Sequence, residues 1–165
     1  MNTSKQILIP VDGSQPSVWA LKLGAQLAKD LSAQITLLHV IIPPAEGVGA
    51  TTLLTDELIE RLRSNGLEML ETAQHQLPPG TAPKTELREG LPAQEIVACA
   101  RLIAADFIIM GSRGRGRWAS FVLGSTTEAV IRWSLCPVIT VSHDPSHAAM
   151  LDEAAEHSGQ PVLTQ

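Results

Sequence analysis

The sequence predicts an α/β domain in which a doubly wound parallel sheet of five strands carries helices on both faces. Short apolar runs alternate with longer stretches of helical periodicity along the chain, and this alternation is typical of parallel sheets joined by right-handed crossovers. The run 7–11 is apolar without a break, and 34–42, 106–110 and 137–141 are mainly apolar, as expected of strands buried on both faces. The 165 residues suit a single domain. A composition of 44% hydrophobic and 18% charged residues excludes a disordered chain.

The first half of the chain predicts a strand, a helix, a strand and a helix. The two strands are the apolar runs 7–11 and 34–42. Between them, Pro16 lies close to a helix start, where its missing N–H is tolerated, and apolar residues then recur at helical spacing. The second helix, over 54–77, has the clearest amphipathic pattern in the chain and ends at a Pro-Pro-Gly turn.

The second half predicts a strand, a helix, a strand, a helix and a last strand. Residues 83–89 are more polar and alternate, which suits an edge strand, and a helix follows from about Pro92. Residues 106–110 read as a buried strand, 126–134 as a helix and 137–141 as the last strand. The side chains expected to face the core from these two helices are Ile96, Val97, Ala100, Ile103, Ala104, Ala129, Val130 and Trp133.

The predicted domain covers residues 1–143, and residues 144–165 are expected to form an acidic, flexible tail. That tail holds four carboxylates and no lysine or arginine. The amino terminus leads straight into the first strand without a signal-peptide pattern, so we expect a cytoplasmic location. No apolar run approaches the ~20 residues of a membrane span, so no membrane partner is expected.

The composition also argues against several kinds of partner and site. A net charge of −5 and a pI of about 5.5 disfavour a sequence-independent grip on DNA, and 3% aromatics without tyrosine are too few for a base-stacking platform. We therefore expect no nucleic-acid partner. Cys99 and Cys136 are far apart in apolar segments, which disfavours a disulfide framework or a zinc site. His39 lies inside a strand and is expected to be a satisfied core or interface histidine, a functional role being the alternative.

The strongest motif joins two glycine clusters within the most basic stretch of this acidic chain. Gly111-Ser112-Arg113-Gly114 is followed by nine residues and then by Gly124-Ser125-Thr126. Glycines let backbone N–H groups approach and surround an anion. The second cluster opens a helix, whose first N–H groups lack intrahelical partners and carry the positive end of the helix dipole. Together the two clusters describe a phosphate cradle.

Simpler explanations exist for each residue of this motif taken singly. A glycine can merely end a strand, Ser125 or Thr126 can merely cap a helix, and the arginines can form a solvated loop. These explanations do not account for two clusters that meet at one sheet edge beside three arginines. A Walker loop and a dinucleotide fingerprint are both absent from the sequence.

Ligands of open α/β sheets bind beyond the carboxyl ends of the strands, where the strand order reverses. Three segments reach that edge: Asp12-Gly13-Ser14, residues 41–42, and the chain from Gly111 onward. Asp12 is either a turn-former or helix cap, or an acceptor for a ligand. Since an ionised carboxylate only accepts hydrogen bonds, Asp12 could pair with the amino group of adenine and would disfavour a guanine carbonyl.

The glycine motif, read together with Pro10-Val11-Asp12-Gly13-Ser14 and His39-Val40, resembles the universal stress protein family. The resemblance runs from about Lys5 to Ser142, most of the chain. The nucleotide-binding branch of that family carries the signature G-x2-G-x9-G-S/T, which the sequence matches without a gap at Gly111, Gly114, Gly124 and Ser125.

The resemblance implies a Rossmann-like sheet of strand order 3-2-1-4-5 that binds ATP, or in some members AMP. Mg²⁺ is a candidate ion because it usually neutralises charge in phosphoryl transfer. By position, Asp12 and the backbone of Val40 would meet the adenine, while the two glycine clusters would hold the ribose and phosphates. The residues carried over to the nucleotide site are Pro10, Val11, Asp12, Val40, Met110, Gly111, Arg113, Gly114, Arg115, Gly124, Ser125 and Thr126.

The leading hypothesis is an adenine-nucleotide-binding regulatory protein of the stress response, with no catalytic residue assigned. A slow ATPase or autophosphorylating enzyme is one alternative, although the sequence after the glycine-rich loop contains no residue that we would assign as a general base. A nucleotide-free dimeric scaffold is another. Members of the family commonly dimerise by pairing their last strands antiparallel, so the resemblance implies a homodimer through Val138 to Ser142.

Overall fold

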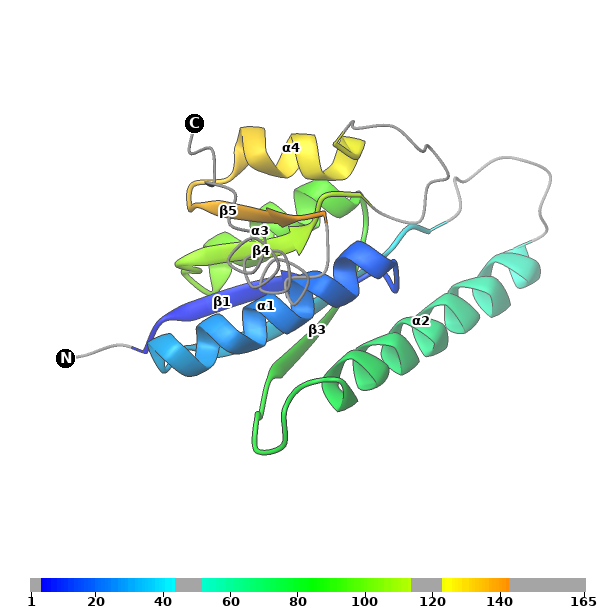
Figure 1. The fold of residues 1–165 in the computed structure, drawn as a ribbon. Coiled ribbons are helices and arrows are strands. Elements are labelled where there is room, and N and C mark those ends of the chain that lie inside the picture. Colours follow the sequence, from blue (N-terminus) through cyan, green and yellow to red (C-terminus); the bar gives the residue numbers. More distant parts are fainter. Residues whose placement is uncertain (1–3, 44–51, 114–122, 143–165) are drawn as a thin grey trace, which may run out of the picture.

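The computed structural model describes residues 4–43, 52–113 and 123–142, with the backbone alone for 52–55. Five parallel strands form one sheet in the order β3-β2-β1-β4-β5 (Figure 1). All four neighbouring pairs run parallel, so the predicted fold class and strand order are confirmed. The strands are β1 (Gln6–Pro10), β2 (Gln34–Ile41), β3 (Lys84–Glu89), β4 (Phe107–Gly111) and β5 (Val138–Val141).

Within the described residues, four helices cover the sheet, two on each face (Figure 1). None of these helices combines the length and the apolar character needed to cross a membrane. The helices are α1 (Gln15–Leu31), α2 (Thr52–His75), α3 (Pro92–Leu102) and α4 (Ser125–Trp133).

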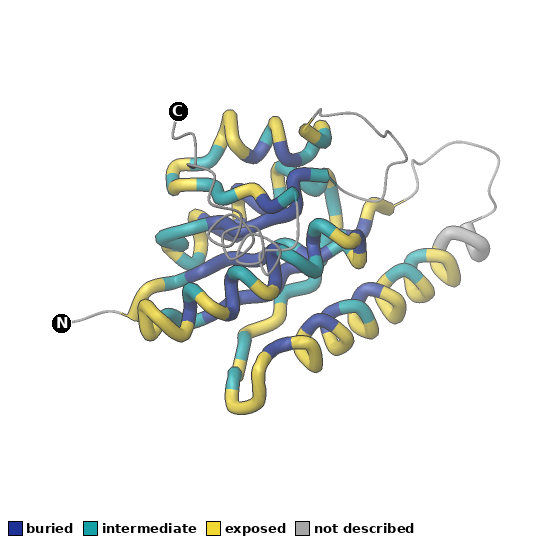
Figure 2. Tube along the Cα trace, in the orientation of Figure 1, coloured by how far each residue is buried: buried dark blue, intermediate teal, exposed yellow. Residues whose placement is uncertain are grey.

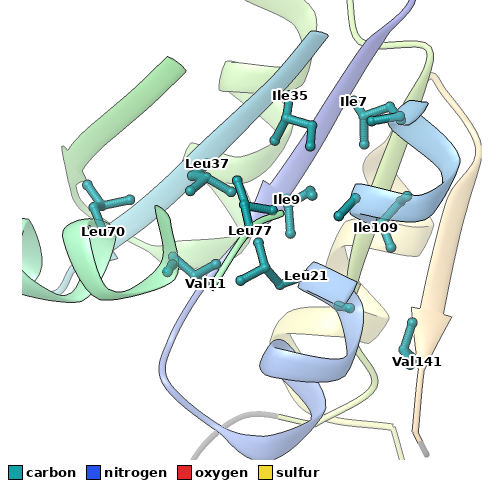
Figure 3. Close-up of a cluster of buried hydrophobic side chains, with 14 residues drawn as sticks. Ile7, Ile9, Val11, Leu21, Ile35, Leu37, Leu70, Leu77, Ile109 and Val141 are labelled. Carbon is teal, nitrogen blue, oxygen red and sulfur yellow. The ribbon is translucent and has the colours of Figure 1, made fainter. Parts of the chain in front are cut away.

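Alternation along the central strand divides the core into two layers. Ile7 and Ile9 of β1 pack with α1 and α2, whereas Leu8 packs with α3 and α4, and all three are fully buried. In the first layer, Leu21 of α1 and Leu70 of α2 lie over the sheet (Figure 3). The buried residues of the sheet are concentrated in β1, β2 and β4, and exposed residues are frequent on the outer faces of the helices (Figure 2). The sheet is therefore covered on both faces, as its apolar runs predict.

Two side chains that the helical periodicity places in the core are exposed instead. Trp133 is 46% exposed. At 3.6 residues per turn, the buried stripe through Thr127 and Val130 continues toward position 134 rather than 133. Ala104 is exposed because α3 ends at Leu102, and the chain then turns through a left-handed conformation with φ 50° at Ala104.

The start of β4 is tied to the amino-terminal end of β1 by Asp106. Its carboxylate accepts hydrogen bonds from Lys5 Nζ at 2.7 Å and from the backbone N–H of Gln6 at 2.9 Å. Its own N–H donates to the carbonyl oxygen of Gln6 at 2.8 Å. The hydrogen bond from Lys5, followed by that from Gln6, holds the pKa of Asp106 below its ordinary value.

We expect the substitution Asp106→Asn to reduce stability in a pH-dependent way. A carboxyl group whose pKa is lowered by folding stabilises the native state above its unfolded pKa, about 3.9. That contribution is lost as the pH falls through the folded pKa. The difference in free energy of unfolding between wild type and Asp106→Asn should therefore be constant at neutral pH and shrink below about pH 4, measured by urea denaturation. Asp56→Asn, an exposed site on α2, is the control, and an equal pH trend there would contradict the assignment.

Candidate nucleotide-binding cleft

A cleft of about 780 Å³ lies at the carboxyl ends of β1, β2 and β4, between α2, α3 and the start of α4. Its volume is within the range of ligand sites, about 300–1,000 Å³. Every predicted site residue that the structure describes lines it; Gly114 and Arg115 lie outside the described residues. These lining residues are Pro10, Val11, Asp12, Val40, Met110, Gly111, Arg113, Gly124, Ser125 and Thr126.

The floor of the cleft is largely apolar. Met110 is 5% exposed and, like the half-buried Val40, packs into the core layer under α3. Pro92 and Ile96 of α3 line the same cleft. An apolar floor with a few polar groups at its rim is the usual construction of a site for a small organic ligand.

Asp12 is held in a tight turn at the end of β1. Its Oδ1 accepts from the backbone N–H of Ser14 at 3.0 Å and from Ser14 Oγ at 2.6 Å. Ser14 Oγ in turn accepts from the N–H of Ser17 at 3.3 Å and caps α1. Ser14, and not Asp12, is therefore the helix cap. Oδ2 of Asp12 has no hydrogen-bond partner among the described residues, so one oxygen forms the turn and the other stays available.

Gly111 brings the end of β4 against the first turn of α1. A Cβ at this position would lie 2.9 Å from the carbonyl carbon of Pro16 and 2.9 Å from the backbone nitrogen of Ser17. On the other side, Thr127 Oγ1 of α4 donates to the carbonyl oxygen of Gly111 at 3.1 Å. The first glycine of the motif is thus required by packing between backbones, a reason that the spacing of the motif alone does not reveal.

The amino terminus of α4 is held beside the end of β4. The N–H of Gly124, the helix cap, donates to the carbonyl oxygen of Ser112 at 2.9 Å. Gly124 provides no side chain to cap the helix. The N–H groups of Ser125 and Thr126 have no partner in the described part of the chain, as expected of a first helical turn. Both residues line the cleft, so donors and the positive end of the helix dipole meet there.

The hydroxyl group of Ser112, directly after β4, is a further polar group at this side of the cleft. Ser112 is 7% exposed, and its enclosed hydroxyl makes no hydrogen bond to any described residue. In the described segments, no group of three or more His, Cys, Asp or Glu side chains could hold a metal ion. The donors at this end of the cleft suit an anion, with Arg113 as the one described cation that lines it.

A family model described as the universal stress protein family matches residues 3–142. The chain belongs to this family. A universal stress protein of Methanocaldococcus jannaschii is 37% identical over 143 residues, covering 85% of this chain and 83% of the relative. The solved structure of universal stress protein UspA from Lactobacillus plantarum has a TM-score of 0.74 at 27% identity, covering 85% and 99% of the two chains. A universal stress protein solved in complex with cAMP has a TM-score of 0.61 at 26% identity, covering 85% and 97%.

The sequence of this universal stress protein does not reveal one wall of its cleft. Leu62, Asn65, Gly66 and Met69 of α2 line the cleft together with His39 of β2. The amphipathic pattern of α2 indicates which face turns toward the sheet. How closely the helix approaches depends on Gly66, and nothing in the sequence around it marks that glycine as a contact.

We expect Gly111→Ala to lower the free energy of unfolding by about 2 kcal/mol, since overpacking of a well-packed site costs roughly 1–3 kcal/mol. The added methyl group would meet backbone atoms of α1, which cannot rotate away. Urea denaturation measures the loss. The neighbouring Ser112→Ala is a matched control, because removing an enclosed hydroxyl without a partner should cost little. A larger loss for Ser112→Ala than for Gly111→Ala would contradict this account.

Proposed function

We propose that this universal stress protein binds an adenine nucleotide, ATP or AMP, and acts as a nucleotide-dependent regulatory module of the stress response. One observation carries the proposal: Ser125 and Thr126, whose N–H groups have no partner among the described residues, line the same cleft as the apolar ends of β1, β2 and β4. An apolar floor suits a purine ring, and free amides at a helix amino terminus suit phosphate.

The phosphate end of the proposed site is the beginning of α4. The backbone N–H groups of Ser125 and Thr126 would donate to phosphate oxygens, and the two side-chain hydroxyls would add further donors. Arg113 lies on the opposite segment of the same cleft and would supply a positive charge. In this arrangement Gly114 and Arg115 would complete the loop around the phosphates, as the signature of the family's nucleotide-binding branch implies.

The base end of the proposed site lies over Pro10, Val40 and Met110. These residues line the cleft at adjacent strand ends, and their apolar atoms would contact the faces of the ring. The free Oδ2 of Asp12 would accept from the adenine amino group. A relative of known structure binds cAMP, which has an adenine ring and one phosphate. This relative supports an adenine ligand for the cleft.

Binding is favoured over rapid hydrolysis because the described residues at the proposed phosphate end include no general base. Ser125, Thr126 and Arg113 would contact the phosphates, and none of these side chains accepts a proton readily at neutral pH. Phosphoryl transfer needs a group that positions a nucleophile, together with charge neutralisation that Mg²⁺ usually supplies. Mg²⁺ would be held here chiefly by the phosphates of ATP. Steady release of ADP above the background of a non-binding variant would instead favour the slow ATPase.

We expect the variant Gly124→Glu to abolish nucleotide binding while it keeps the fold. A carboxylate at the helix cap would occupy the cleft and repel phosphate. For a ligand at 100 times its Kd, wild type should gain about 2.7 kcal/mol, a rise in Tm of roughly 5–10 °C. Gly124→Glu should show no rise with ATP–Mg²⁺ or AMP. Ile131→Glu, which adds the same charge at an exposed position of α4, should respond like wild type. A full response in Gly124→Glu would argue against this site.

We also propose that the protein forms a homodimer through the outer edge of β5. Within the described residues, β5 pairs only with β4 and ends the sheet. The carbonyl oxygens of Pro137 and Val141 accept from β4 and the residue that follows it. Since backbone groups alternate in direction along a strand, those of Val138 and Thr140 point to the outer edge. That edge is suited to antiparallel pairing with a second copy.

We expect Thr140→Pro to convert this dimer into a monomer. Proline removes an outward N–H and leaves the bonds of its neighbours to β4 in place. Sedimentation velocity would measure the mass, with circular dichroism as the test of fold. Thr140→Ala, which keeps the N–H, should remain dimeric. A dimeric Thr140→Pro variant would place the interface elsewhere.

A further inference from the structure

The ring of His39 is fixed by a hydrogen bond at the edge of the cleft. His39 lies near the end of β2, is half-buried, and lines the cleft. Its Nδ1 is 2.7 Å from the carbonyl oxygen of Val11. Because a carbonyl oxygen only accepts, Nδ1 must carry the hydrogen. In the neutral ring, Nε2 is then an acceptor with a free lone pair.

A second edge of the ring packs against α2. A Cβ on Gly66 would lie 3.0 Å from Cδ2 of His39 and 2.7 Å from Leu87 Cδ1, so the missing side chain of Gly66 leaves room for the ring. Two edges of the imidazole are thereby occupied, one by Val11, which follows β1, and one by Gly66 of α2. Nε2 has no hydrogen-bond partner among the described residues, although its ring is held in place on both sides.

We propose that His39 contacts the ligand and that its Nε2 accepts a hydrogen bond from the nucleoside part of the bound nucleotide. This inference rests on the proposed function. The donors of adenosine are the amino group of the base and the hydroxyl groups of the ribose. The adenine amino group has two hydrogens, so it could donate both to Oδ2 of Asp12 and to Nε2 of His39, neither of which accepts a hydrogen bond from a described residue. A ligand that presented a carbonyl to this nitrogen would leave two acceptors facing each other, which is unfavourable.

Two substitutions of His39 test the roles of its two ring nitrogens separately. The amide nitrogen of asparagine lies close to the place of Nδ1, so His39→Asn keeps a donor for Val11 and removes the acceptor in the cleft. The amide of glutamine reaches the place of Nε2, so His39→Gln keeps an acceptor and gives up the bond to Val11. A merely structural role predicts a loss of stability with His39→Gln and unchanged binding with His39→Asn.

The experiment measures the Kd of AMP at pH 8 by calorimetry and the urea midpoint of each protein. We expect His39→Asn to bind AMP about fivefold more weakly than wild type, in line with the net strength of one hydrogen bond, with a near-normal urea midpoint. His39→Gln should bind within about twofold of wild type, with a lower midpoint. Wild-type affinity in His39→Asn would overturn the proposal.

Two analogues identify the donor and provide a second test. Purine riboside 5′-monophosphate lacks the amino group, and 2′-deoxy-AMP lacks one ribose hydroxyl. If His39→Asn costs affinity for AMP but not for one analogue, the group missing from that analogue is the donor, as in a double-mutant cycle. Equal losses for AMP and both analogues would leave the 3′-hydroxyl as the donor, which 3′-deoxy-AMP tests; an equal loss for that analogue as well would overturn the proposal. If wild type binds none of the three nucleotides, the proposed function fails first; if wild type binds and His39→Asn is unaffected, only this inference fails.

Discussion

The approach of Gly111 to the first turn of α1 is the constraint on which the cleft depends. Because no Cβ intervenes, the end of β4 lies directly against the backbone of Pro16 and Ser17. The carbonyl group of the same glycine accepts from Thr127 and so fixes α4 as well. Ser14 Oγ lies 3.3 Å from the carbonyl oxygen of Arg113, so the turn after β1 and the chain after β4 lie next to each other. Packing therefore sets the walls of the cleft before a ligand enters, and such preorganisation reduces the ordering cost of binding.

The strands and helices could be predicted because each has a characteristic spacing of apolar residues within its own stretch of sequence. The exposure of Trp133 could not, since it depends on where α4 ends and which stripe of that helix meets α3. The glycine spacing located one end of the cleft, because parallel strands bring their carboxyl ends to one edge. The α2 wall escaped prediction for the opposite reason. It depends on contacts between Gly66 and side chains of β2 and β3, which lie far from it in the chain.

Asp12 shows that two explanations of one residue need not compete. The sequence left it as either a turn-former or a ligand acceptor. The structure assigns the turn to Oδ1, which accepts both bonds from Ser14. A carboxylate has a second oxygen, and the turn fixes the direction in which that oxygen points. In the proposed site, the turn would therefore orient the carboxylate toward a ligand and would not remove it from the site.

The lining of the proposed cleft includes both hydrogen-bond donors and acceptors. Among the described residues, the amides of Ser125 and Thr126 are donors without partners, Asp12 Oδ2 and His39 Nε2 are acceptors without partners, and all four residues line the cleft. An adenine nucleotide has the complementary polarity, with phosphate acceptors at one end and an amino donor at the other. A guanine nucleotide would satisfy the amides but present its carbonyl to two acceptors. Neutral amides act at short range, so a chain of net charge −5 can hold a polyanion without a large basic surface.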